Sequence, residues 1–139
     1  MSRLIHVSVA GLLVLFVAAA AAAAPSAPRL LGCDGKTLLR PPGLVVLSCA
    51  DANSEIRGTQ WLTWGRSSAS GITTFGVNLC TPTCAGSNMT FFAHSRVRLL
   101  DPKRTRLGLL FSRAVVTYMQ HGHAKTFTAY PPTRPRPTQ

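Results

Sequence analysis

The sequence has very few acidic residues. Its 139 residues contain 4 aspartates and glutamates against 15 lysines and arginines, so the formal net charge is +11 at pH 7. The acids are Asp34, Asp51, Glu55 and Asp101. A carboxylate pair of the glycosidase kind would have to come from Asp51 and Glu55, which an exposed loop after a strand explains equally well. This scarcity argues against catalysis by paired carboxylates.

The sequence also lacks the short motifs of nucleophilic catalysis. It contains no G-x-S-x-G motif, and the stretch GRSSASG at residues 65–71 has its serines and glycines at the wrong spacing. We therefore expect a non-enzymatic protein that uses no cofactor. The alternative is a small secreted hydrolase whose serine, histidine and acid come from distant positions.

Long apolar runs are missing except at the N-terminus. Leu4 to Ala19 is almost wholly apolar, follows the cationic start Ser2-Arg3, and continues into an alanine tract that ends at Ala24. This order predicts a secretory signal peptide over residues 1–24 and hence a secreted, extracellular protein. A membrane span needs about 20 apolar residues, and Leu4 to Ala24 is long enough to qualify, so a retained N-terminal anchor is the alternative.

Basic charge dominates the mature chain. Removing Arg3 leaves 14 lysines and arginines, and the net charge becomes 14 − 4 = +10. Such a surface attracts polyanions, here an anionic component of the cell envelope or an acidic macromolecule. The candidate anion-binding residues are Arg96, Arg98, Lys103, Arg104, Arg106 and Arg113. Aromatic residues do not interleave with them, so no specific nucleic-acid recognition is expected. A solvated, functionally silent surface is the alternative.

Four cysteines lie in the mature part: Cys33, Cys49, Cys80 and Cys84. An even number in an exported chain indicates disulfides. Three pairings are open, and proximity along the chain favours Cys33 with Cys49 and Cys80 with Cys84. The C-x-x-x-C spacing of the second pair differs from the C-x-x-C of thioredoxin-type centres.

The stretch LLGC, Leu30 to Cys33, offers a different fate for the first cysteine. It matches the four residues that precede a lipid-modified bacterial cysteine, so a lipid anchor through Cys33 is an alternative. Pro25, Pro28 and Arg29 stand between the apolar run and this stretch, whereas such a cysteine normally follows the run directly. A disulfide therefore remains the main expectation.

Short segments rich in β-branched and aromatic residues alternate with turn residues. They cover residues 44–50, 59–66, 71–80, 89–100, 107–119 and 125–130. This pattern predicts an all-β fold, a small antiparallel β-sandwich of immunoglobulin-like size stapled by disulfides. We expect the domain over residues 44–130, an N-terminal linker with the first disulfide segment over 25–43, and a disordered proline-rich tail over 131–139.

Two local features of this pattern carry specific expectations. Trp61 and Trp64 are three residues apart, which puts them on opposite faces of a regular strand. Asp101-Pro102 is expected to end the strand that starts at Met89. The residues 100–106 would then form a basic hairpin connection beside Arg96 and Arg98.

The stretch YMQHGHAK contains a candidate metal site. Met119, His121 and His123 alternate, and on a continued strand they would point the same way. Two imidazoles and a thioether are a plausible copper-binding set, which makes extracellular copper binding an alternative function. Gly122 favours a hairpin turn that would break the alternation.

Several stretches taken together resemble a known group of proteins. They are LSCADAN at residues 47–53, WLTWG at 61–65, NLCTPTCAGS at 78–87 and LGLLFSRAVVTY at 107–118. These resemble small secreted actinobacterial proteins that carry a C-A-D-x-N box and an N-x-C-x-P-x-C-A-x-G loop. The resemblance implies export and a small disulfide-bearing domain. It implies no activity, so no mechanism transfers with it.

Overall fold

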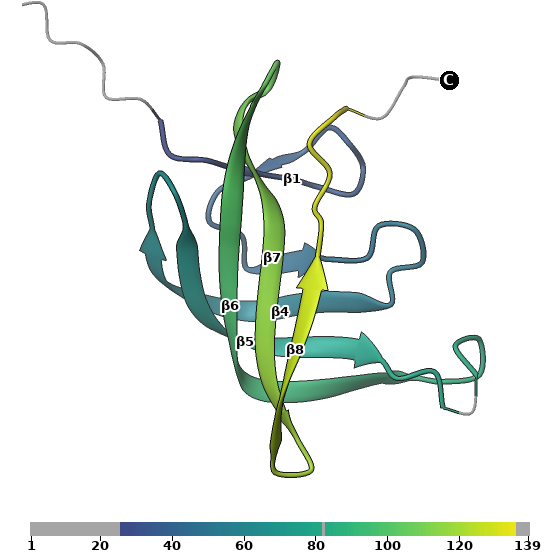
Figure 1. Cartoon of the computed structure of the whole chain (residues 1–139). Coiled ribbons are helices and arrows are strands. Elements are labelled where there is room, and N and C mark those ends of the chain that lie inside the picture. The colour runs from purple at the N-terminus through teal and green to yellow at the C-terminus, as the bar shows by residue number, and fades with distance from the viewer. Residues whose placement is uncertain (1–25, 82, 136–139) are drawn as a thin grey trace, which may run out of the picture.

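The protein is built from β-strands in the part of the chain that the structure describes. The computed structural model describes residues 26–81 and 83–135, and the signal peptide expected over residues 1–24 lies outside them (Figure 1). Within these ranges no helix is long and apolar enough to cross a membrane. The strands are β1 (Leu30–Leu31), β2 (Leu38–Leu39), β3 (Leu44–Val46), β4 (Ser54–Trp64), β5 (Ala69–Asn78), β6 (Met89–Thr105), β7 (Gly108–Gln120) and β8 (His123–Ala129). The prediction of an all-β fold is confirmed.

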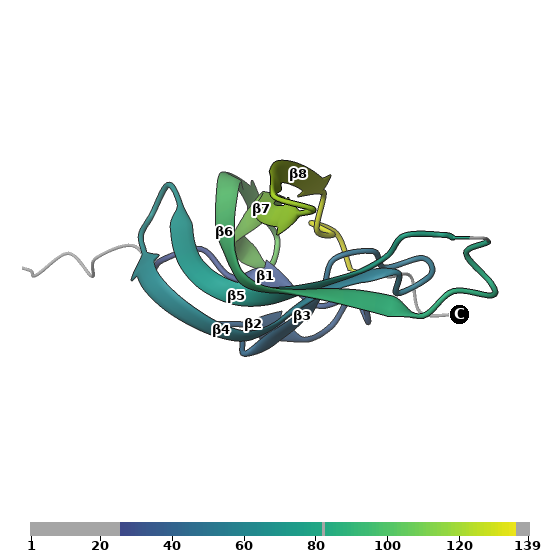
Figure 2. The same cartoon turned by 90° about the horizontal axis from the view of Figure 1, so that it is seen from below.

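One folded sheet makes up most of the domain. Strands β3 to β8 follow one another in the order of the sequence, each antiparallel to the next, while β1 and β2 form a separate two-stranded sheet. The first part of β6 pairs with β5 and its later part pairs with β7. The sheet bends along β6, so that β7 and β8 run across the direction of β4 and β5 (Figures 1 and 2). The two layers of the expected sandwich are therefore the two halves of one continuous sheet.

Two β-bulges bend this sheet on either side of β5. The β4–β5 register slips by one residue beside Gly58, whose φ is 58°. The β5–β6 register slips beside His94, whose φ is 54°. Between the two bulges, the Thr73 hydroxyl donates a hydrogen bond of 3.1 Å to the carbonyl of Arg57. Because a bulge increases local twist and bends its strand, this pair explains why the sheet folds here.

Two expected strand boundaries fall inside longer strands. The strand expected to begin at residue 59 begins at Ser54, and Gly58 lies within β4 as a bulge. Asp101-Pro102 does not end β6, which continues to Thr105. At this point Asp101 adopts a φ of 52°, and the Ser112 hydroxyl donates a 2.7 Å hydrogen bond to its carbonyl. A side-chain hydrogen bond thus satisfies a backbone group where the regular ladder is interrupted, and the strand continues.

The N-terminal segment fills the concave side of the sheet. Leu30 is fully buried in one cluster with Phe75 of β5 and Phe111 of β7. Arg29 forms a parallel bridge to Leu110 of β7. This strand pairing and burial make residues 26–43 part of the domain. The expectation that they form a linker is wrong, because the folded sheet needs their leucines to complete its core.

The start of the C-terminal tail also packs. Pro131 is buried, although β8 ends at Ala129. The expectation of an unpacked tail is therefore wrong for its first residues, where a proline side chain covers apolar surface without needing a backbone hydrogen bond. Residues 136–139 lie outside the described part of the chain.

Both favoured disulfides are formed. Cys33 and Cys49 are joined with their Cα atoms 5.0 Å apart, and Cys80 is joined to Cys84. The lipid-anchor alternative conflicts with this arrangement, because a chain that began at Cys33 would lose the buried Leu30 and Leu31. The disulfide-stapled domain predicted from cysteine spacing is confirmed.

A third bulge puts both tryptophans on the inner side of β4. Trp61 lies opposite Gly71 and Thr63 lies opposite Ser70, so Leu62 has no partner on β5. The extra residue reverses the alternation, and the two indole rings meet edge to face with centroids 4.7 Å apart. The expectation of opposite faces is therefore wrong. Leu62 between them is left 66% exposed.

Backbone carbonyls of the N-terminal segment accept hydrogen bonds from both indole N–H groups. The indole N–H of Trp61 donates to the carbonyl of Pro42 at 2.8 Å, and that of Trp64 donates to the carbonyl of Pro28 at 2.9 Å. Both rings pack against the core cluster while their polar atoms are satisfied, as buried indoles require. Trp64 thereby ties β4 to the segment that crosses the concave side.

Candidate anion-binding surface

All four acidic side chains already have partners within the chain. The Asp34 carboxylate accepts hydrogen bonds from the backbone N–H groups of Lys36 and Thr37 and from the Thr37 hydroxyl. These bonds lower the pKa of Asp34 to about 2, the bond from the Thr37 hydroxyl being the largest cause. The Asp51 carboxylate accepts bonds from the backbone N–H of Asn53 at 3.1 Å and from its side-chain amide at 2.8 Å.

The other two acids form ion pairs. Glu55 pairs with Arg57 at 2.6 Å, and the Arg57 guanidinium also lies 3.7 Å from the centre of the Phe91 ring. Asp101 pairs with Arg113, with 2.7 Å between Oδ2 and Nε. Arg113 therefore has an ion-pair partner within its own chain and falls outside the candidate anion-binding set. Only the fold brings these residues together, because β6 continues past Asp101 and places it near Arg113 on β7.

The remaining cations of the expected cluster are exposed. Arg96, Arg98, Lys103, Arg104 and Arg106 have no ion pair among the described residues. They divide into two groups. Arg96 and Arg98 lie in the middle of β6 on the outer face of the sheet, whereas the other three lie at the far end of the β6–β7 hairpin.

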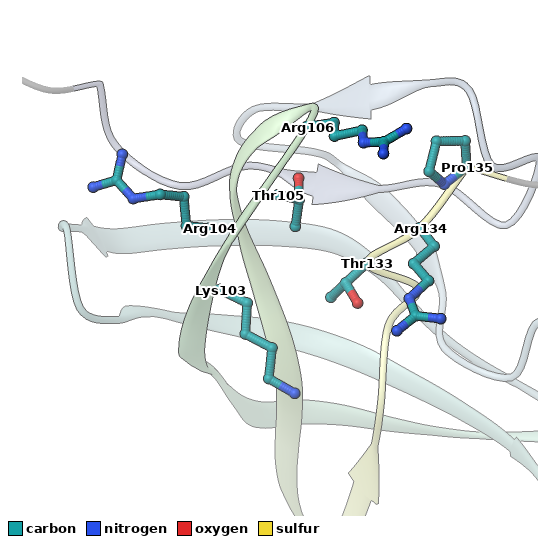
Figure 3. Close-up of a pocket in the computed structure, with 7 residues that line it drawn as sticks. All are labelled: Lys103, Arg104, Thr105, Arg106, Thr133, Arg134 and Pro135. Atoms are coloured by element: carbon teal, nitrogen blue, oxygen red, sulfur yellow. The ribbon is translucent and has the colours of Figure 1, made fainter.

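The hairpin end and the C-terminal tail enclose a shallow hollow of about 630 Å³ (Figure 3). We call this feature the hairpin–tail hollow; its lining residues are Lys103, Arg104, Thr105, Arg106, Thr133, Arg134 and Pro135. In Figure 3, Arg106 extends towards Pro135, while Arg104 points away on the other side of the hairpin. The lining therefore carries four cations, two hydroxyls and no carboxylate, a chemistry suited to phosphate, sulfate or carboxylate groups.

Arg134 is a member of this hollow that the sequence did not assign. Its stretch, PPTRPRPTQ, was expected to be disordered, although it alternates arginine with proline. The buried Pro131 positions the tail beside the hairpin end, so that Arg134 joins cations distant in sequence. The basic residues of the tail could have suggested a role in anion binding, but the neighbouring sequence does not show where the tail packs.

The hairpin end is held in place by its own hydrogen bonds. The Thr105 hydroxyl accepts from the backbone N–H of Leu107 at 3.0 Å and donates to the carbonyl of Gly108 at 2.9 Å. The Arg29 guanidinium donates to the carbonyl of Leu107. Gly108 has a φ of 101°, which glycine adopts without strain. These contacts order the turn backbone that carries Arg106 before any ligand arrives.

Arg96 and Arg98 line a second hollow on the outer face, of about 480 Å³. Arg96 lies directly opposite Ile72 on β5, and Arg98 lies opposite Ser70. Leu62 of β4 completes the surroundings. This mid-sheet hollow thus combines two arginines with two exposed aliphatic side chains, which distinguishes it from the polar hairpin–tail hollow.

The candidate copper residues do not share one strand face. β7 ends at Gln120 and β8 starts at His123, which pair across a two-residue turn formed by His121 and Gly122. Both turn residues have positive φ, 50° and 76°, as the tight turns of antiparallel hairpins require. The continued strand on which the copper hypothesis depended is therefore interrupted. Within residues 26–81 and 83–135, no cluster of three or more His, Cys, Asp or Glu side chains is arranged to hold a metal.

The two acids considered as a catalytic pair each have a different partner in the structure. Glu55 is engaged with Arg57, and Asp51 is engaged with Asn53 in an exposed turn. Each acid therefore holds its own local structure. In the described part of the chain, no hydrogen bond joins a histidine to a serine or a carboxylate.

Two of the resemblance motifs meet in one hydrogen-bond network. The Asn78 side-chain amide donates to the carbonyl of Cys84 at 2.8 Å and to Asn53 Oδ1 at 3.3 Å. Its own Oδ1 accepts from the backbone N–H of Cys80 at 2.8 Å. Asn53 is in turn held by Asp51. The C-A-D-x-N box therefore supports the disulfide loop at one end of the sheet, a structural use that the sequence did not reveal.

A scan against protein-family models and searches of curated proteins and of solved structures found no match for this chain. The resemblance to small secreted actinobacterial proteins stays a prediction. Function is therefore inferred from the chemistry and geometry of the surface.

Proposed function

We propose that the protein is a secreted, non-enzymatic binding protein of the bacterial envelope or exterior, and that the hairpin–tail hollow contacts an anionic polymer or surface. The observation that carries this proposal is the engagement of all four acids elsewhere, Asp101 with Arg113 included. The four cations of the hollow are thus left without a carboxylate partner among the described residues. Folding does not use these charges, which makes them available to an external anion.

The physical basis of binding is charge attraction reinforced by hydrogen bonding. Guanidinium groups form short, charge-assisted hydrogen bonds with phosphate, sulfate and carboxylate oxygens. Exposed charges interact weakly one at a time and are screened within about 10 Å at 0.1 M salt. A repeated anion that meets Lys103, Arg106 and Arg134 together gains several such contacts, so binding should weaken steeply as salt increases.

The proposed location agrees with the covalent framework. Disulfides form and persist in oxidising compartments outside the cytoplasm, and the structure contains two of them. The apolar N-terminal run with its alanine tract supports export. Secretion would place the basic hollow among the anionic polymers of the envelope.

Binding to inorganic polyphosphate at increasing salt tests this proposal. The site variant is Lys103→Gln/Arg106→Gln/Arg134→Gln, which removes the three cations proposed to meet the anion together. The control variant, Lys36→Gln/Arg66→Gln/Lys125→Gln, removes the same charge from three exposed positions outside the hollow. We expect the site variant to lose most binding and to lower the slope of log affinity against log salt by about 2. Equal losses in the two variants would show that net charge alone attracts the polymer, and the hollow would be refuted.

A further inference from the structure

The mid-sheet hollow differs chemically from the site just proposed. It lies on the outer face of the sheet, where Leu62 is 66% and Ile72 is 37% exposed. Arg96 and Arg98 flank these two side chains from the neighbouring strand. Exposed apolar side chains rimmed by charged groups are typical of interaction surfaces.

The exposure of Leu62 is a consequence of the backbone. The bulge in β4 turns Trp61 and Trp64 to the inner side and leaves Leu62 without a partner on β5. The core cluster is complete without this leucine. Its apolar side chain therefore projects next to Ile72 without contributing to the packing of the domain.

The charge around the hollow has one sign. Across the sheet, Arg96 lies opposite Thr117 and Arg98 lies opposite Val115 on β7, and the β8 residues beyond these are Thr126 and Thr128. None of the four acids of the chain lines the hollow, and each has its own partner; Asp101, three residues beyond Arg98 on β6, is paired with Arg113. An occupant must therefore combine an anionic group with aliphatic surface.

We propose that this face docks on the surface of an anionic lipid bilayer. Arg96 and Arg98 bind lipid phosphates, while Leu62 and Ile72 enter the boundary between headgroups and acyl chains. Peripheral binding of this kind combines buried apolar area with attraction to anionic lipids. The inference goes beyond the polyanion site, because a soluble polymer offers nothing to the aliphatic pair.

Co-sedimentation with vesicles tests the proposal on the mature, disulfide-bonded protein. The vesicles are phosphatidylglycerol mixed with phosphatidylcholine, with pure phosphatidylcholine for comparison. Leu62→Ser/Ile72→Thr should lower binding to the anionic vesicles about tenfold or more, because it removes the apolar insertion. Arg96→Gln/Arg98→Gln should lower it about 30-fold. Leu44→Ser is the matched control, because Leu44 is 55% exposed but lies on β3 away from the hollow.

The same variants, tested with polyphosphate, separate the two sites. We expect Leu62→Ser/Ile72→Thr to bind polyphosphate like the unmodified protein. Bilayer docking is refuted if these substitutions leave vesicle binding unchanged, or if Leu44→Ser lowers it equally. It is also refuted if Arg96→Gln/Arg98→Gln reduces polyphosphate and vesicle binding by the same factor, which would make this face part of the polyanion site. Bilayer docking is supported if Leu62→Ser/Ile72→Thr loses vesicle binding while its polyphosphate binding stays intact.

Discussion

The inner and outer surfaces of β4 differ sharply over only four residues. On the inner side, Trp61 and Trp64 pack edge to face, and each indole N–H has a backbone acceptor. On the outer side, Leu62 projects towards solvent and Thr63 shares a hydrogen bond with Ser70. One bulge produces both arrangements. The comparison shows that the same backbone irregularity completes the core and exposes an apolar side chain.

The two surfaces also differ in which substitutions they tolerate. On the inner surface the packing is close: a Cβ atom at Gly71, opposite Trp61, would come within 2.7 Å of the Gln60 carbonyl oxygen. Charge distinguishes the outer surface, where Arg96 and Arg98 have no ion pair among the described residues. We therefore expect substitutions on the inner side to change stability and those on the outer side to change binding.

The largest predicted effect comes from Trp64→Ala. This substitution removes an indole that contacts Trp61 and Phe111 and that holds the carbonyl of Pro28. We expect the free energy of unfolding to fall by about 3–5 kcal/mol, as for other large-to-small aromatic substitutions. Urea denaturation followed by fluorescence of the remaining Trp61 would measure it.

Leu62→Ala is the paired test on the outer surface. Because Leu62 is mostly exposed, its truncation should change stability by less than about 0.5 kcal/mol. A comparable loss in the two variants would contradict the division into a packed and a solvent-facing side.

The two disulfides differ in the length of chain that they enclose. Cys33–Cys49 spans 16 residues and fastens the segment that fills the concave side, whereas Cys80–Cys84 spans 4 residues in an exposed loop. Loop-closure entropy predicts that Cys33→Ser/Cys49→Ser lowers stability by about 3 kcal/mol and Cys80→Ser/Cys84→Ser by about 2 kcal/mol. Thermal unfolding of both variants would check the order, and a reversed order would contradict it.

The effect expected at Asp34 depends on pH. Its pKa is lowered from the ordinary 3.8 to about 2 by the hydrogen bonds from Thr37 and Lys36. A lowered folded-state pKa contributes stability that is present above pH 4 and is lost as pH falls through about 2. We expect Asp34→Asn to flatten the acid dependence of unfolding in this window. Titration of the Asp34 carboxyl carbon by NMR would check the pKa, and an ordinary midpoint would refute the prediction.

Local patterns predicted the strands well where the chain alternates regularly. Ser95, Val97 and Leu99 are buried, while Arg96 and Arg98 are exposed, as their spacing indicates. Ala93, which the same spacing puts on the buried side, is exposed, because the bulge at His94 interrupts the alternation. The disulfide pairing also followed from proximity along the chain. Strand alternation and the disulfide pairing depend on residues that are close along the chain, so they can be predicted from the sequence.

The candidate surface was predicted only in part. Five of the six expected cations are exposed and have no ion pair in the described part of the chain, but Arg113 is paired with Asp101, and Arg134 was missed. Both errors have one cause. Ion pairing and tail packing join residues through the hairpin and the buried Pro131, and no short stretch of sequence records such contacts.

The sequence by itself determined the all-β class, the disulfide framework and the excess of basic charge, because composition, alternation and cysteine spacing act locally. Only the tertiary structure decided which charges remain unneutralised and which side chains share a face. The bulges at Gly58, Leu62 and His94 arise where a folded sheet must bend against its neighbours. A one-residue slip reverses every later side chain, so the alternation of the sequence cannot reveal it.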